Sequence, residues 1–321
     1  MLCSQLPFGY TGVMRDGGVV SSSTMPERVE ASGASASGIG AGFRIVWECV
    51  SYRIRNLEMA NLAAAGSIAV ALHLHWLDIG IRTVFAFLLN VLVYLNNDYI
   101  DVAVDLQSAD KDNEKTRFLH KHIRAAFWAQ IALLLGLAAM AVVYDIGLLV
   151  PLIAGGGVCW WYSYQLKRCP YLDIVAMMIW GITMPLVGSP LLSVLGWCLA
   201  LQLGLFSGVF ESIQVVRDAD EDSKEGVRTT AVVLGKSRTL WLARAIMVTV
   251  SVYAGLVLHP IAAVITLAAL FVPFVPDNVE RYWTRVKLVY GIAWLFICAW
   301  VFFKGQSSGL LWAIERTASL S

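Results

Sequence analysis

The stretch VFAFLLNVLVYLNNDYIDVAVD, residues Val84–Asp105, decides the fold of this chain. Its first half is almost entirely apolar, whereas its last ten residues contain three carboxylates and two amides. A helix needs about 20 mainly apolar residues to cross the hydrocarbon core of a bilayer. The pattern predicts a transmembrane helix that ends in an acidic turn at the membrane surface.

The composition of the whole chain predicts an all-α, polytopic membrane protein. Of its 321 residues, 58% are hydrophobic and 15% are charged, and the mean hydropathy is +0.67, whereas soluble domains carry roughly 25% charged residues. The net charge of +1 gives no indication of a nucleic-acid partner. The six cysteines are scattered without a CxxC pair, which argues against a disulfide framework or a zinc site.

Nine apolar segments approach or reach the length of a membrane span, and together they predict one domain over residues 43–305. Residues 1–42 are rich in Ser, Gly and Ala, which predicts a disordered cytoplasmic tail and not a secretory signal. Residues 306–321 are expected to form a short C-terminal tail. The predicted spans are 55–77, 81–99, 124–143, 146–163, 172–190, 192–214, 240–258, 260–275 and 286–304.

The basic residues predict how these spans are oriented. With nine spans, eighteen of the 24 Lys and Arg residues fall in the N-terminal flank and the alternate connections on one side. This asymmetry follows the positive-inside rule. We therefore expect the N terminus and the acidic helix end to face the cytoplasm, in the inner membrane of a bacterial cell.

The acidic turn gathers its side chains on one face of the helix. At 100° per residue, Asn97, Asp101, Asp105 and Asp98 lie within one quarter of the helix surface. A second cluster, RDADED at Arg217–Asp222, ends the predicted span at 192–214, on the same side of the membrane. In this second cluster Asp218 and Asp222 share a face at i, i+4, which Glu211 and Gln214 extend into the span, whereas Asp220 points the opposite way.

Like charges on one face destabilise a helix, and ionisable groups at a membrane are usually functional. All-oxygen ligands favour Mg²⁺, which binds through one or two carboxylates together with water and phosphate oxygens. Basic residues beside these carboxylates indicate a polyanionic ligand. The pattern therefore predicts a membrane enzyme that acts on a diphosphate with a lipid tail.

At these residues the chain resembles the UbiA superfamily of intramembrane prenyltransferases. Its NDxxDxxxD motif is similar to Asn97–Asp105, and its DxxxD motif with a following glycine is similar to Asp218–Gly226. The run GVRTTAVVLG (Gly226–Gly235) and the stretch YSYQLKR (Tyr162–Arg168) also look like the family's sequences. Two departures concern the substrate pockets. The family has a tyrosine four residues before its lysine, whereas Tyr162 and Tyr164 lie five and three residues before Lys167. The family also often has Arg-Pro after its first motif, and the stretch KTRFLHKH has no proline.

The resemblance implies nine transmembrane helices around a central cavity and Mg²⁺-dependent transfer of an isoprenyl chain from an allylic prenyl diphosphate to an aromatic acceptor. The expected metal ligands are Asn97, Asp98, Asp101, Asp105, Asp218 and Asp222. All of these except Asp98 are also expected to be catalytic, together with Lys167. The expected substrate-binding residues are Arg117, Tyr162, Tyr164, Glu211, Gln214, Lys224 and Arg228.

Several alternatives stay open at the level of the sequence. Glu211, Asp98 or the pyrophosphate itself is a candidate for the base that removes the ring proton. The acceptor could be a phenolic acid, a quinone precursor or a heteroaromatic phenol such as a quinolone, and no obligate protein partner is evident. A terpene cyclase without an acceptor would use the same ionisation, and a membrane cation transporter would also need intramembrane carboxylates.

Overall fold

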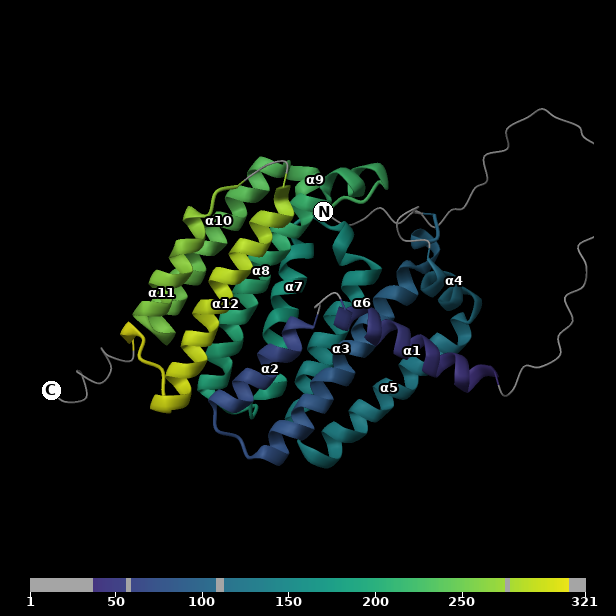
Figure 1. Cartoon of the computed structure of the whole chain (residues 1–321), viewed down its shortest axis with the longest axis horizontal. Helices are drawn as coiled ribbons and strands as arrows, with labels where there is room; N and C mark the ends of the chain where they lie inside the picture. Colours follow the sequence, from purple (N-terminus) through teal and green to yellow (C-terminus); the bar gives the residue numbers. More distant parts are fainter. Residues whose placement is uncertain (1–36, 56–58, 108–112, 275–277, 312–321) are drawn as a thin grey trace, which may run out of the picture.

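The computed structural model of the chain describes residues 37–311 except 56–58, 108–112 and 275–277. These residues form helices and connections, with no β-strand among them. Within them, six helical segments are long and apolar enough to cross a membrane (Figure 1). They are α3 (Trp76–Asp105), α5 (Ile123–Tyr144), η1 to α6 (Ile146–Tyr164), α8 (Val194–Lys224), α10 with η5 (Lys236–Leu258) and α12 (Val279–Lys304).

Three further apolar helices are shorter. The prediction of nine spans is therefore confirmed for six segments by length and composition, while the other three correspond to apolar helix that falls short of a full span. For one of the three, α7, the cause is Pro185: the α-helix ends at Thr183 and the chain continues only as a 3₁₀ turn. The three are α2 (Ala60–Ala71), α7 with η4 (Leu172–Gly188) and α11 with η6 (Pro260–Phe271).

The division at residues 259–260, which hydropathy leaves uncertain, is a true break between two helices. His259 has an extended backbone, with φ −162°, and its Nδ1 accepts a hydrogen bond of 3.1 Å from the backbone N–H of Ile261. Pro260 then occupies the first turn of α11, where its missing N–H leaves no hydrogen bond unmade. The histidine and the proline together end one helix and begin the next.

Glycines bring α7 and α8 into close contact. A Cβ atom on Gly204 would lie 2.2 Å from Cγ1 of Ile182, and one on Gly181 would lie 2.1 Å from Oγ of Ser207. Between apolar helices in lipid the hydrophobic effect supplies little drive, so small residues that allow close van der Waals packing decide which faces meet. This contact fixes the side of α8 that faces α7.

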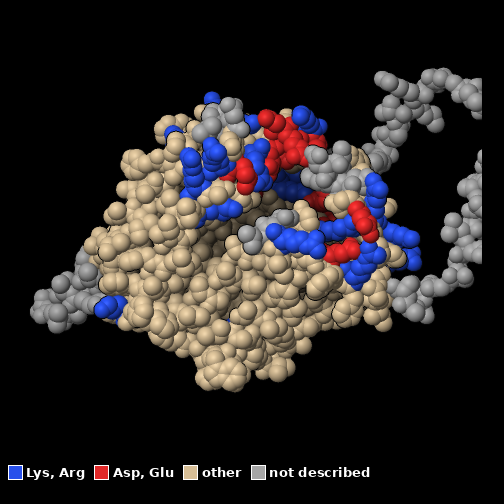
Figure 2. All heavy atoms as spheres, in the orientation of Figure 1, with Lys and Arg blue, Asp and Glu red and all other residues tan. Residues whose placement is uncertain are grey.

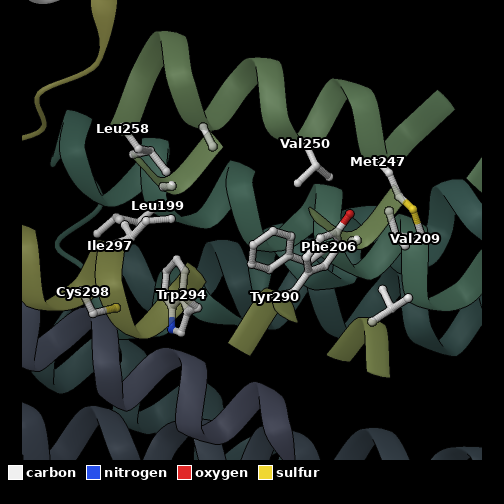
Figure 3. Packing of buried hydrophobic residues seen from close by; sticks show 14 of the residues in the cluster. Leu199, Phe206, Val209, Met247, Val250, Leu258, Tyr290, Trp294, Ile297 and Cys298 are labelled. Carbon is white, nitrogen blue, oxygen red and sulfur yellow. The ribbon is translucent and has the colours of Figure 1, made fainter. Parts of the chain in front are cut away.

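The largest buried cluster holds α8 from the other side, against α10 and α12. The rings of Phe206 and Tyr290 stack with their centroids 4.4 Å apart, and Met247 and Val250 of α10 lie beside them (Figure 3). Helix α8 is therefore packed on two sides. This packing fixes the position of the C-terminal turns of α8, which contain the second acidic cluster.

The chain ends differ from the expected tails. Helix α1 (Ser37–Arg55) begins within the residues expected to be disordered, so the tail boundary at residue 42 is wrong for 37–42; residues 1–36 lie outside the described residues. The cause is that α1 is amphipathic, and a search for long apolar runs does not find such a helix. Near the other end, the N–H of Ser308 donates to the carbonyl of Leu258 at 2.8 Å, so this part of the predicted C-terminal tail packs on the bundle.

Candidate active site

The C-terminal end of α3 presents Asn97 and Asp101 to α6 and the turn that follows it. Oγ of Ser163, on α6, donates a hydrogen bond of 2.9 Å to Oδ1 of Asn97. Lys167, in the 3₁₀ turn η3 (Leu166–Arg168), forms an ion pair with Asp101. The structure thus brings the first motif and the predicted lysine together.

Asp98 faces a different part of the molecule. Its Oδ1 accepts from Arg53 of α1 at 2.7 Å, and its Oδ2 lies 2.6 Å from Nζ of Lys115 in α4 (Glu114–Lys121). The side chain of Asp98 is only 11% exposed. Asp98 therefore contacts cations on α1 and α4, whereas Asn97 and Asp101 contact α6 and the turn after it. The helical projection placed Asp98 near Asp101 but could not show which helices pack against each side chain.

The second motif lies at the C-terminal end of α8. The guanidinium of Arg217 donates two hydrogen bonds, of 2.7 and 3.0 Å, to the carboxylate of its neighbour Asp218. It also donates a hydrogen bond of 3.0 Å to Glu280 of α12. Asp222 is half-buried. Asp220 is exposed and pairs with Lys236, as its position on the helix projection predicts. The side chain of Asp218 is 43% exposed against 77% for Asp220, so Asp218 and Asp222 are the less exposed acids of this motif.

Helix α6 also contacts α8, through the residue next to Ser163. The hydroxyl of Tyr162 donates a hydrogen bond of 2.9 Å to Oε1 of Glu211, which is buried. Tyr164, by contrast, is 52% exposed and stacks on Trp160. Of the two tyrosines with imperfect spacing from Lys167, only Tyr162 therefore reaches the stripe on α8.

The remaining predicted residues lie around this arrangement. Gln214, within α8, and Asp105, the last residue of α3, are half-buried. Lys224 and Arg228 are exposed beyond the second motif, and Arg117 is exposed on α4, in a shallow surface pocket with Asn113 and Lys121. Figure 2 shows acidic side chains in two groups among Lys and Arg near one end of the molecule, on either side of a hollow in the face drawn.

Sequence reasoning missed an acidic residue that supports the second motif. Asp173 of α7 is fully buried and accepts hydrogen bonds from the backbone N–H of Thr230, at 2.7 Å, and from the hydroxyl of the same residue. It thereby ties the start of α9 (Thr230–Leu234), and the loop that follows α8, to α7. A lone carboxylate at the start of an apolar segment was the available signal. Arg53, Lys115, Ser163 and Arg217 were also not singled out for the contacts described above.

The oxygen ligands fit a magnesium site that a substrate completes. In the described part of the chain, no three Asp, Glu, His or Cys side chains come close enough together to hold a metal ion by themselves. Mg²⁺ usually takes only one or two carboxylates from a protein and fills its shell with water and phosphate oxygens. The pair Asn97 and Asp101 supplies one carboxylate and one amide oxygen, and the pair Asp218 and Asp222 supplies two carboxylates. Each pair lies within the number of carboxylates that Mg²⁺ takes from a protein.

Comparison with known proteins decides the family. A model of the UbiA prenyltransferase family matches residues 59–303, which include both acidic motifs and most of the chain. The chain belongs to the UbiA prenyltransferase family. No curated protein sequence gives a significant match.

Solved structures share the fold of this UbiA family member. A digeranylgeranylglyceryl phosphate synthase has a TM-score of 0.61 and 13% sequence identity, over 83% of this chain and 99% of that chain. A UbiA homologue from Archaeoglobus fulgidus bound to GPP and Mg²⁺ has a TM-score of 0.56 and 14% identity, over 82% and 98%. The same homologue bound to DMAPP and Mg²⁺ has a TM-score of 0.53 and 13% identity, over 76% and 95%.

Proposed function

We propose that this UbiA family member transfers an isoprenyl chain from an allylic prenyl diphosphate to an aromatic acceptor, with Mg²⁺ as cofactor, and releases pyrophosphate. The observation that carries the proposal is the position of α6. Two adjacent residues of this helix contact both acidic stripes, since Ser163 binds Asn97 of α3 and Tyr162 binds Glu211 of α8. The complexes of the A. fulgidus homologue with GPP or DMAPP and Mg²⁺ support the choice of substrate and metal.

The residues at the two motifs bind and orient the diphosphate. When bound, Mg²⁺ supplies Lewis-acid stabilisation of negative charge on the phosphate oxygens. Asn97, Asp101, Asp218 and Asp222 hold it, while Lys167 adds a fixed positive charge at the first motif. Stabilising the charge that develops on the departing group in this way is a major contribution to catalysis.

The reaction breaks the carbon–oxygen bond of the allylic diphosphate, and the electron pair of this bond leaves with pyrophosphate. The resulting allylic cation takes an electron pair from the acceptor ring, which forms the new carbon–carbon bond. A base then removes the ring proton. Glu211 is favoured over Asp98 as that base, because Asp98 is held by two cations whereas Glu211 accepts a hydrogen bond from the neutral hydroxyl of Tyr162.

Turnover by the full-length chain in lipid nanodiscs tests this function. Geranyl, farnesyl and longer diphosphates are supplied with Mg²⁺ and a panel of phenolic acids, naphthoates and quinolones, and the products are identified by mass spectrometry. We expect a prenylated aromatic product that is lost in Asp101→Asn and Asp218→Asn but kept in Asp220→Asn. The last variant is a matched control, because Asp220 lies in the same motif but is exposed.

The same assay separates the rival functions. A cyclic hydrocarbon and pyrophosphate from prenyl diphosphate alone would identify a terpene cyclase. Uptake of Mg²⁺ into vesicles without any prenyl turnover would identify a transporter. A wild-type rate in Asp101→Asn and Asp218→Asn would refute the proposed site.

We further propose that the charged end of the molecule faces the cytoplasm of a bacterial cell, with the chain in the inner membrane. The basis is the concentration of Lys and Arg near that end. Lys121 is exposed on α4, so Lys121→Cys offers a label site there. In a background without native cysteines, a membrane-impermeant maleimide should label it in inside-out vesicles and not in intact spheroplasts; the reverse result would overturn the orientation.

A further inference from the structure

Helix α1 has an apolar face that no described residue covers. Ile39, Phe43, Trp47 and Ile54 are 76%, 77%, 70% and 54% exposed. At 3.6 residues per turn they fall within roughly 80° of the helix circumference, so they form one continuous stripe. We call these four residues the α1 apolar stripe. A stripe of this size on a surface helix indicates a contact surface.

The opposite face of α1 is fixed to the rest of the protein. Ala41, Ile45 and Cys49 are buried, and a Cβ atom on Gly42 would lie 3.7 Å from the carbonyl oxygen of Ala125 in α5. Arg53 pairs with Asp98 of the first acidic motif. The α1 apolar stripe is therefore held on the outside of the molecule in a defined direction.

The position of α1 points to the bilayer surface as its partner. Gly42 packs near Ala125 and Ala129, which lie in the first two turns of the membrane-spanning helix α5. In Figure 1, α1 lies across the direction of the long helices α8 and α12, not parallel to them. Helix α1 thus lies at the level where α5 enters the membrane.

The charges around the stripe suit the same partner. Arg55 is exposed at the end of α1 beside the stripe, and Lys121 and Arg124 are exposed where α4 meets α5. Arg44 also lies beside the stripe, but it is paired with Glu48 and Glu114. Helices with an apolar stripe and flanking basic residues lie in the plane of the membrane interface and favour anionic lipids. The family match begins at residue 59, so α1 lies outside it.

We propose that α1 is an in-plane helix that inserts its apolar stripe into the cytoplasmic interface of a bilayer containing anionic lipids. Through the contact between Arg53 and Asp98, this helix joins the membrane surface to the first acidic motif. The proposal rests on the position and exposure of α1, and it holds whether or not the prenyl-transfer function is confirmed.

Depth measurements on the full-length chain test the proposal directly. Single cysteines at Ile39, Phe43 or Arg55, in a background without native cysteines, carry a nitroxide label in vesicles of phosphatidylethanolamine and the anionic lipid phosphatidylglycerol. We expect the labels at Ile39 and Phe43 to collide more with oxygen, which concentrates in lipid, and the label at Arg55 to collide more with a water-soluble nickel chelate. Equal access of the chelate at all three positions would overturn the proposal.

Two other occupants of the stripe would give different signals. Dipolar broadening in a singly labelled sample at Phe43 would show that a second copy of the chain covers the stripe. Low access of both oxygen and the nickel chelate, with an immobilised label, would show that another part of the same chain covers it. Either result would overturn the proposal.

A second experiment measures whether the lipid holds α1 in place. Cys49, the only cysteine kept, lies on the buried face of α1 and becomes reactive when the helix moves away from the bundle. Phe43→Asp should increase its labelling in anionic vesicles about tenfold or more, the factor expected for one lost buried aromatic side chain. Phe43→Leu is the matched control and should leave the rate unchanged; equal rates in Phe43→Asp and Phe43→Leu would contradict a role for the bilayer.

Discussion

Tyr162 of α6 donates a hydrogen bond to the buried Glu211 of α8, with 2.9 Å between the two oxygen atoms. The next residue along α6, Ser163, binds Asn97 of α3. One turn of α6 therefore connects the first acidic motif to the stripe on α8 that leads to the second motif, more than a hundred residues later in the sequence. A change in this turn should affect both motifs at once.

The first prediction concerns the proton that the acceptor ring loses. If Glu211 is the base, Glu211→Gln should reduce prenylated product by about 10²-fold or more, a typical contribution of general-base catalysis. Tyr162→Phe keeps the carboxylate and should lose much less. Product and pyrophosphate are measured separately, and an unchanged product rate in Glu211→Gln would move the role of base to another group.

The second prediction concerns Lys167, which pairs with Asp101. Lys167→Met should raise KM for the prenyl diphosphate about tenfold or more, because it removes charge-assisted hydrogen bonds to the phosphate oxygens. Lys167→Arg should recover part of the affinity. Lys236→Met is the control, since Lys236 pairs with the exposed Asp220; an equal KM in the two methionine variants would count against a phosphate contact.

The third prediction concerns Asp173, whose hydrogen bonds to Thr230 hold the loop that follows the second motif. Asp173→Asn keeps the shape of the side chain but weakens its hydrogen bonds to Thr230, and we expect a loss of about 1–3 kcal/mol in the free energy of unfolding. The thermal unfolding midpoint in detergent should fall, and the loop after α8 should become more sensitive to protease. Wild-type values for both would show that Asp173 does not support the loop.

Much of the fold can be read from the sequence because membrane helices need long apolar runs. The same physics does not reveal α1, whose stripe alternates with Arg44, Glu48 and Arg53. For the site, helical periodicity placed Asn97 and Asp101 on one face correctly. It could not show that Asp98, three residues before Asp101, turns to Arg53 and Lys115, because partners on other helices are decided by packing.

The fourth prediction concerns the contact between α7 and α8. Gly204→Ala places a Cβ atom 2.2 Å from Ile182, and such overpacking costs about 1–3 kcal/mol. Gly291→Ala in α12 meets no atom within 4 Å, so its higher helix propensity should leave stability unchanged or slightly raised. The unfolding midpoints of the two variants are compared in the same detergent, and equal midpoints would show that the two helices can move apart without cost.

The last prediction concerns the thiol of Cys49 on the buried face of α1. Burial, with a smaller effect of the neighbouring Asp98, raises the pKa of this thiol from 9.0 to about 12. Because the folded state favours the protonated thiol, its contribution to stability is complete below pH 9 and is lost as the pH rises towards 12. Only the thiolate reacts readily, so folded protein that retains Cys49 alone should react with a small thiosulfonate very slowly at pH 8. The rate should increase steeply above pH 9, and unfolded protein should react at once; equal rates for folded and unfolded protein at pH 8 would show that the packing of α1 does not shield the thiol.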